Sequence, residues 1–120
     1  MPSIPKILVV DDESDAVDLV AFNLKNAGFD VISAADGESA IAKAKSQLPD
    51  LVILDQNMPG MDGLQTMEQI RALYPNLVVL IASGQSDIEE WDCFKRPMVD
   101  VIPKPFTLEE IQTRLAQFFG

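Results

Sequence analysis

The sequence predicts a doubly wound α/β fold, a five-stranded parallel sheet with helices on both faces. Short continuous runs of Val, Ile and Leu alternate along the chain with longer stretches in which apolar residues recur every three or four positions. Continuous apolar runs are typical of strands covered on both faces, as in parallel sheets. Their alternation with amphipathic stretches indicates β–α units joined by right-handed crossovers.

Five apolar runs are the predicted strands. They cover residues 6–10, 30–34, 51–55, 77–82 and 100–103. Because each run is short and rich in Val, Ile and Leu, we expect a strand rather than a helix at each.

Amphipathic stretches between the runs predict the helices. Ser14 is expected to cap the first, which Gly28 ends. The apolar face of this helix comprises Val17, Val20, Ala21 and Leu24. The alanine-rich residues 37–47 predict a second helix, and residues 64–73 predict a third that Pro75 ends.

The sequence supports the last two predicted helices to different degrees. Thr107 followed by Glu110 resembles a capping box. The apolar stripe behind it, expected to pack on the core, comprises Leu108, Ile111, Leu115 and Phe118. The helix predicted before the fifth strand is weaker, because Pro97 interrupts it. It carries Trp91 and Phe94, and we expect at least one of them to pack on the sheet, while exposure of the other would indicate a partner contact.

Composition and charge restrict the function. The length indicates one domain over residues 1–120, and the net charge of −10 argues against direct binding of nucleic acid or an anionic membrane surface. No apolar run reaches the ~20 residues that a membrane-spanning helix needs. The single Cys93 excludes an internal disulfide, so we expect a cytoplasmic protein. The chain has no histidine, which excludes Ser–His and Cys–His catalysis.

Polar side chains follow four of the predicted strands. These are Asp11 and Asp12 after the first, Asp55 at the end of the third, Ser83 after the fourth and Lys104 after the fifth. Ligands of open α/β sheets bind at the carboxyl ends of the strands, so these residues are expected along one rim. Each alone is most simply a turn or cap residue, but the set together indicates a site.

The charges of this rim predict its chemistry. Three ionised carboxylates repel one another, and one divalent cation together with the Lys104 ammonium would balance them. Oxygen ligands without histidine or cysteine favour Mg²⁺. A carboxylate beside Mg²⁺, a lysine and a hydroxyl is equipped to accept a phosphoryl group.

Four motifs resemble, in order, those of the receiver domain of two-component response regulators. They are VVDDE at 9–13, LVILDQNMPGMDG at 51–63, IASG at 81–84 and KPF at 104–106. The DxxMPGMDG part is the most specific, and the resemblance covers essentially the whole chain. It implies the CheY-like and flavodoxin-like form of the doubly wound fold, with strand order 2-1-3-4-5.

The resemblance implies a role for each carboxylate of the rim. Asp55 matches the phosphoacceptor. Asp11 and Asp12 match the acidic pair that binds Mg²⁺, with Asp12 as the direct ligand and Asp11 acting through water. Asp55 and the backbone carbonyl of Asn57 complete the implied metal ligands.

The remaining residues of the rim are assigned in the same way. The Ser83 hydroxyl would reach a phosphoryl oxygen, and Lys104 would pair with the phosphoryl group. The Lys104–Pro105 peptide bond is expected to be cis. Gln56 and Gln85 flank the site and would tune the lifetime of the acyl phosphate by controlling water access.

The function implied by the resemblance is a phosphorylation-dependent signalling switch that catalyses only its own phosphorylation and dephosphorylation. Its phosphodonor would be a histidine kinase or a histidine phosphotransfer domain. Its target would be a downstream protein or a fused output domain, reached through the face of the fourth helix, fifth strand and fifth helix. That face also supports dimers in the family, so a phosphorylation-dependent homodimer is an expected form.

Three positions depart from the family, the first being Pro97, in the region where many receivers have GAD-like residues. Many receivers carry an aromatic residue three positions before the lysine, where this chain has Val101, so the usual aromatic switch is not expected. Pro103 removes a backbone donor at the end of the fifth strand.

Two alternatives remain open. An Mg²⁺-dependent phosphatase with an aspartyl nucleophile would use the same chemistry, but it usually has an acid two residues after the nucleophile, where this chain has Asn57. The second alternative is a binding module that keeps only the fold. The complete set of acids, hydroxyl and lysine argues against it. A nucleotide-binding role is weaker, since no Gly-rich loop follows the first strand.

Overall fold

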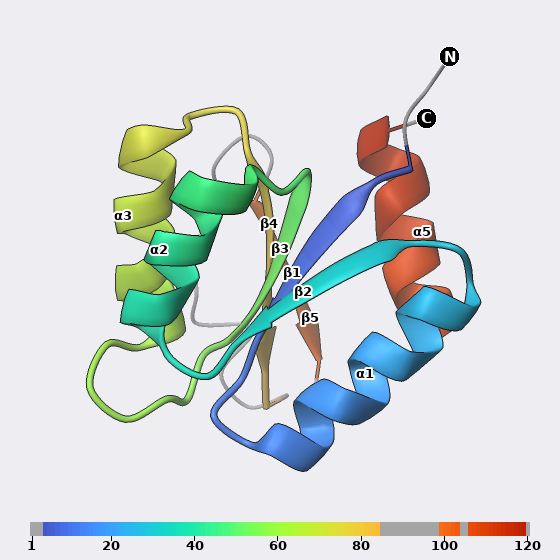
Figure 1. Cartoon of the computed structure of the whole chain (residues 1–120), viewed down its shortest axis with the longest axis horizontal. Coiled ribbons are helices and arrows are strands. Elements are labelled where there is room, and N and C mark those ends of the chain that lie inside the picture. Colours follow the sequence, from blue (N-terminus) through green and yellow to red (C-terminus); the bar gives the residue numbers. More distant parts are fainter. Residues whose placement is uncertain (1–3, 85–98, 104–105, 120) are drawn as a thin grey trace.

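The computed structural model describes residues 4–84, 99–103 and 106–119 and contains a parallel five-stranded sheet between two layers of helices (Figure 1). The elements in chain order are β1 (Lys6–Val10), α1 (Ser14–Asn26), β2 (Asp30–Ala34), α2 (Gly37–Gln47), β3 (Leu51–Asp55), α3 (Gly63–Leu73), β4 (Val78–Ser83), β5 (Val99–Pro103) and α5 (Leu108–Phe119). The strand order is β2-β1-β3-β4-β5, which confirms the predicted fold class and order. Among the described residues, no helix combines the length and the apolar character needed to cross a membrane.

The strand bounds agree closely with those predicted. β1, β2 and β3 match residue for residue, whereas β4 lies one residue later than expected and β5 begins one residue earlier. Ser83 is therefore the last residue of β4 rather than the residue after it. The predicted fourth helix, with Trp91, Phe94 and Pro97, lies outside the described residues.

The start of α1 corrects the sequence prediction. Its N-cap is Glu13, whose side chain makes no capping hydrogen bond, and Ser14 is already the first helical residue. The backbone N–H of Glu13 donates to Asp11 Oδ1 at 3.0 Å, and the carbonyl of Glu13 accepts from Val17 N–H at 3.1 Å. The chain therefore turns into the helix directly after β1, because the Asp11 carboxylate closes that turn.

Side chains cap the other helices whose starts are described. Asp36 accepts from Ser39 N–H at 2.7 Å at the start of α2. Asp62 and Gln65 form a capping box at α3, in which each side chain accepts the backbone N–H of the other residue. At α5, the Thr107 hydroxyl accepts from the Glu110 N–H at 3.1 Å, as predicted.

The core has two halves, one on each face of the sheet. One half lies between the sheet and α1 with α5, and the other lies against α2 and α3 (Figure 1). Ile111 and Leu115 of the predicted α5 stripe are buried in the first half, and Leu108 packs against it. The side chain of Phe118 lies outside the described residues. Because the strands carry apolar side chains on both faces, the polar residues lie at the strand ends, including the carboxyl edge of the sheet.

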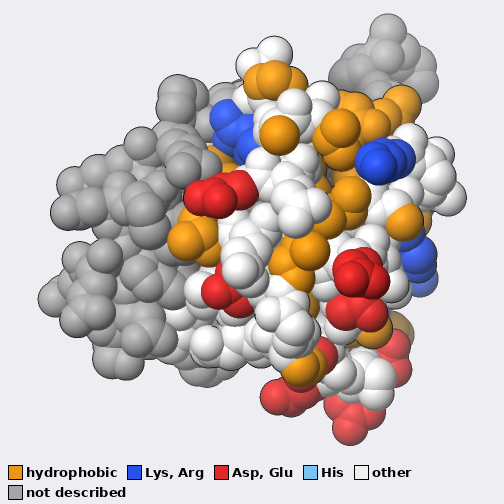
Figure 2. All heavy atoms as spheres, turned by 90° about the vertical axis from the view of Figure 1, so that its left-hand side faces the viewer, with side chains coloured by type: hydrophobic (Ala, Val, Ile, Leu, Met, Phe, Trp, Pro, Cys, Tyr) orange, Lys and Arg blue, Asp and Glu red, His pale blue; other side chains and the backbone are white. Residues whose placement is uncertain are grey.

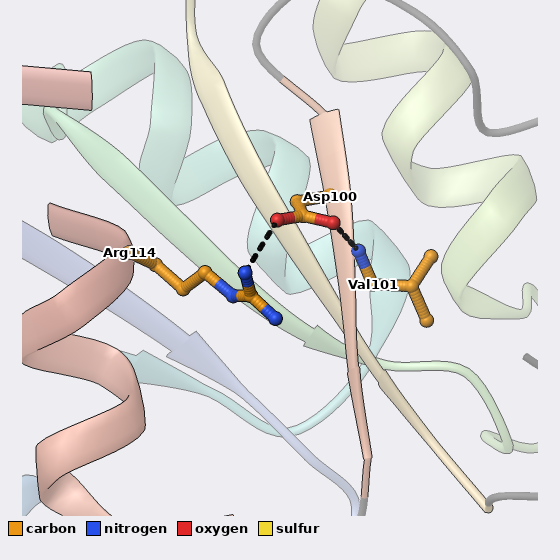
Figure 3. A network of polar contacts seen from close by, with 3 residues as sticks. All are labelled: Asp100, Val101 and Arg114. Carbon is orange, nitrogen blue, oxygen red and sulfur yellow. Dashed lines mark hydrogen bonds and ion pairs between the residues drawn. The ribbon is translucent and has the colours of Figure 1, made fainter. Parts of the chain in front are cut away.

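A polar network ties α5 to the edge strand β5 (Figure 3). The Asp100 carboxylate accepts the N–H of Val101 at 2.8 Å and pairs with the Arg114 guanidinium at 3.3 Å. Both partners of the ion pair are partly exposed. The contact therefore orients α5 on the sheet more than it stabilises the fold.

Candidate functional site

Three aspartates meet at the carboxyl edge of the sheet. Asp11 and Asp12 follow β1, and Asp55 ends β3. One carboxylate oxygen from each lies within 4.8 Å of those of the other two. Asp11 and Asp55 are 8% and 4% exposed, while Asp12 is exposed. The structure thus brings together all three carboxylates that the sequence placed at this rim.

The register of the strands explains the clustering. β1 and β3 are adjacent and parallel, with Val10 opposite Leu54, so the next residue of each strand, Asp11 and Asp55, lies at the same edge. The backbone N–H of Asp11 donates to the carbonyl of Ala34 at 3.2 Å, which continues the β1–β2 ladder through Asp11. Parallel pairing alone therefore makes neighbours of residues that are 44 positions apart.

Each buried carboxylate accepts a backbone N–H from two residues further along the chain. For Asp11 the donor is Glu13 at 3.0 Å, and for Asp55 it is Asn57 at 3.4 Å. These turns, typical of aspartate, orient the carboxylates at the start of the two loops. Asn57, the predicted source of a carbonyl ligand, is therefore held beside Asp55.

Ser83 lies on the neighbouring strand. Asp55 pairs with Ala82 of β4, so Ser83 is one residue beyond that pair at the same edge. Its side chain is fully buried, and its Oγ has no hydrogen-bond partner among the residues that the structure describes. Buried hydroxyls are normally paired, so a Ser83 oxygen without a described partner is unusual.

Val101 occupies the position where the resemblance expects an aromatic ring. It lies opposite Ile81 in the β4–β5 ladder and packs, partly buried, against the core half on the α2–α3 side. Lys104, the Lys104–Pro105 bond and Gln85 lie outside the described residues, so their predicted features stay predictions.

Gln56 makes a contact that the sequence did not predict. Its side-chain oxygen Oε1 accepts the backbone N–H of Leu64 at 2.9 Å, at the start of α3. Nothing in the spacing of these two residues signals the contact, because it depends on the path of the intervening loop.

The surface charge is uneven around the site. Figure 2 shows the α2–α3 face, where acidic side chains gather toward the lower end and lysine and arginine side chains lie higher. The lower end corresponds to the carboxyl edge of the sheet in Figure 1. In a chain of net charge −10, this edge is therefore a favourable place for a cation.

Known proteins are similar to this chain in sequence and in fold. The model of the response regulator receiver domain family matches residues 7–116. The alkaline phosphatase synthesis transcriptional regulatory protein PhoP of Bacillus subtilis (strain 168) is 35% identical over 113 residues, covering 92% of this chain and 46% of the relative. The chain thus spans about half the length of that relative.

Solved structures agree. The chemotaxis protein CheY4 of Vibrio cholerae is 29% identical with a TM-score of 0.83, covering 97% of this chain and 99% of that one. NtrX of Brucella abortus is 36% identical with a TM-score of 0.85, covering 96% of this chain and 26% of that one. The chain therefore belongs to the family of receiver domains of two-component response regulators.

Proposed function

We propose that this chain is a signalling switch in which Asp55 accepts a phosphoryl group from a phosphohistidine. The observation that carries the proposal is the buried Asp55 carboxylate, which is clustered with Asp11 and Asp12. It lies one strand from the buried hydroxyl of Ser83, which has no hydrogen-bond partner in the part of the chain that the structure describes. The Asp55 carboxylate can accept a phosphoryl group, and the Ser83 hydroxyl can donate a hydrogen bond to one of its oxygens.

The donor set fits Mg²⁺. Three carboxylates with oxygens within 4.8 Å of one another are hard ligands, and the chain has no histidine to favour a softer metal. Asp11, Asp12, Asp55 and the carbonyl of Asn57 would hold the ion. When bound, Mg²⁺ would offset the carboxylate charge and the charge of the phosphoryl oxygens.

The chain's own residues then have distinct tasks. A carboxylate oxygen of Asp55 attacks phosphorus, the P–N bond of the phosphohistidine breaks, and its electron pair goes to the departing imidazole nitrogen. The Ser83 hydroxyl donates to a phosphoryl oxygen and so gains a partner that the described residues do not supply. Lys104 pairs with the phosphoryl group, as the family resemblance implies.

The switch follows from this change of partners. Movement of Ser83 toward the phosphoryl group would repack the end of β4 against β5, where Val101 offers an aliphatic side chain instead of a ring. The affected face would comprise β5, α5 and the helix that the sequence predicts before β5. It would bind a downstream protein, a fused output domain or a second copy of the chain. The phosphodonor would be a histidine kinase or a histidine phosphotransfer domain of the cytoplasm.

A labelling experiment tests the proposal. Purified protein is incubated with acetyl phosphate and Mg²⁺, and its intact mass is measured. We expect a gain of one phosphoryl group that disappears with a chelator and in Asp55→Asn. Asp50→Asn is the matched control, because Asp50 precedes the same strand at its other end. Labelling that persists in Asp55→Asn would overturn the site, and continuous release of phosphate from small phosphoesters would favour a phosphatase instead.

A further inference from the structure

Gln56 joins three elements at the site. Its backbone N–H donates to the Ala82 carbonyl of β4 at 2.9 Å. Its own carbonyl accepts the N–H of Gly63 at 3.1 Å, and its side-chain Oε1 accepts the N–H of Leu64 at 2.9 Å. The loop of residues 57–62 therefore begins next to Gln56 and returns to it.

The same residue satisfies two of the N–H groups that a helix start leaves without intrahelical partners. Gly63 and Leu64 are the first two residues of α3, and Asp62 takes the N–H of the third, Gln65. A side chain placed next to the phosphoacceptor thus performs part of the helix capping. The start of α3 therefore depends on a residue that directly follows β3, and not only on residues of the helix and its N-cap.

The helix start also lies directly on the phosphoacceptor's backbone. A Cβ added to the buried Gly63 would come within 2.8 Å of the Asp55 carbonyl oxygen and 2.9 Å of Gln56 Cα. Only glycine allows this approach, because backbone atoms cannot move aside as a flexible side chain could. The position of α3 and the position of Asp55 are therefore coupled through Gln56.

We propose that Gln56 is a positioning residue that holds Asn57 and Asp55 in the arrangement that binds the metal ion. The inference rests on the proposed function, since it assigns the Asn57 carbonyl to that ion. Gln56 lies between the two residues in sequence, and the N–H of Asn57 donates to Asp55 Oδ1 at 3.4 Å. Fixing Gln56 at its N–H, its carbonyl and its side chain restricts the conformations that the loop can adopt before binding, which lowers the entropy lost on binding.

The test compares two substitutions of the same kind. Gln56→Met keeps the length of the side chain but removes Oε1. Gln65→Met is the matched control, because Gln65 Oε1 also accepts one backbone N–H at the start of α3, that of Asp62 at 3.0 Å. Gln56→Glu keeps an acceptor oxygen and is the conservative rescue.

Three measurements are made on each protein. Amide hydrogen exchange at Leu64 reports the hydrogen bond itself, Mg²⁺ titration by calorimetry reports affinity, and acetyl phosphate labelling at several Mg²⁺ concentrations separates half-saturation from maximal rate. In Gln56→Met we expect faster exchange at Leu64, an Mg²⁺ dissociation constant raised about three- to tenfold and a matching rise in the half-saturating concentration. Gln65→Met should stay within about twofold of wild type in both metal measurements, and Gln56→Glu should bind Mg²⁺ no more weakly than wild type.

Two results would overturn the inference. One is unchanged Mg²⁺ affinity in Gln56→Met despite a lower melting temperature, which would make Gln56 a helix cap only. The other is equal loss of affinity in Gln56→Met and Gln56→Glu. Wild type that binds Mg²⁺ but does not label would count against the proposed function alone, because the exchange and calorimetric comparisons would still decide the role of Gln56.

Discussion

Replacing Ser83 by alanine should stabilise the unphosphorylated protein. The Ser83 hydroxyl is fully buried and has no hydrogen-bond partner among the described residues. A buried polar group left unpaired costs about 1–3 kcal/mol, whereas the loss of one oxygen atom leaves little empty volume. We therefore expect the free energy of unfolding to rise by about 1 kcal/mol and the melting temperature by about 4 °C.

Urea and thermal unfolding without Mg²⁺ or phosphodonor measure this effect. Thr66 supplies the control, since its hydroxyl is equally buried but donates to the Asp62 carbonyl at 2.8 Å. Thr66→Val should lower the free energy of unfolding by about 1 kcal/mol, the opposite sign. In acetyl phosphate and Mg²⁺, Ser83→Ala should gain less stability than wild type, because it cannot donate to the phosphoryl group.

A destabilised Ser83→Ala would refute the reasoning. It would mean that the hydroxyl already has a partner in the unphosphorylated protein. A Ser83→Ala variant that is stabilised but gains as much stability as wild type from phosphorylation would contradict the proposed role of the hydroxyl at the phosphoryl group.

Three further predictions concern residues away from the site. Leu48 ends α2 in the left-handed region with φ 47° and is 63% exposed, so Leu48→Gly should raise the free energy of unfolding by about 1 kcal/mol in urea titrations. Hydrogen bonds from the backbone and side chain of Ser39 lower the pKa of Asp36 in the folded protein below its unfolded value of 3.8. The ionised Asp36 therefore stabilises the fold above pH 3.8, and this contribution is lost as the pH falls through the lower pKa of the folded state. The stability difference between wild type and Asp36→Ala, measured by thermal melts across pH, should therefore be constant near neutrality and shrink below about pH 4, and a difference that grows on acidification would contradict it. Arg114→Gln should cost less than about 1 kcal/mol, and less still at high salt, because its ion pair with Asp100 is partly exposed; a larger, salt-independent loss would contradict this.

Local rules account for the elements that the sequence predicted correctly. Three strands match residue for residue, and in two of them, β1 and β3, continuous runs of Val, Ile and Leu are buried on both faces of the sheet. The sequence also predicted the cap formed by Thr107 and Glu110, because both partners lie within one helical turn. The error at Ser14 arose from a competing interaction, the Asp11 carboxylate that closes the turn one residue earlier.

The sequence predicted the clustering of the three carboxylates of the rim, but not the environment of Ser83. Asp11, Asp12 and Asp55 were expected together because parallel strands deliver their carboxyl ends to one edge, and the cluster confirms this. The sequence could not predict that Ser83 is fully buried without a described hydrogen-bond partner, because burial and pairing depend on neighbouring strands and loops.

The sequence by itself determined the alternation of the described strands and helices along the chain and the acidic edge of the sheet, since these follow from residue type and periodicity. Only the tertiary structure decided which hydrogen bonds join the end of β3 to the start of α3. Gln56 and Leu64 are eight residues apart, and their hydrogen bond exists because the loop returns α3 to the end of β3. The physical reason is that a side chain's hydrogen-bond partner is set by the path of the whole backbone, whereas its charge and hydropathy are its own.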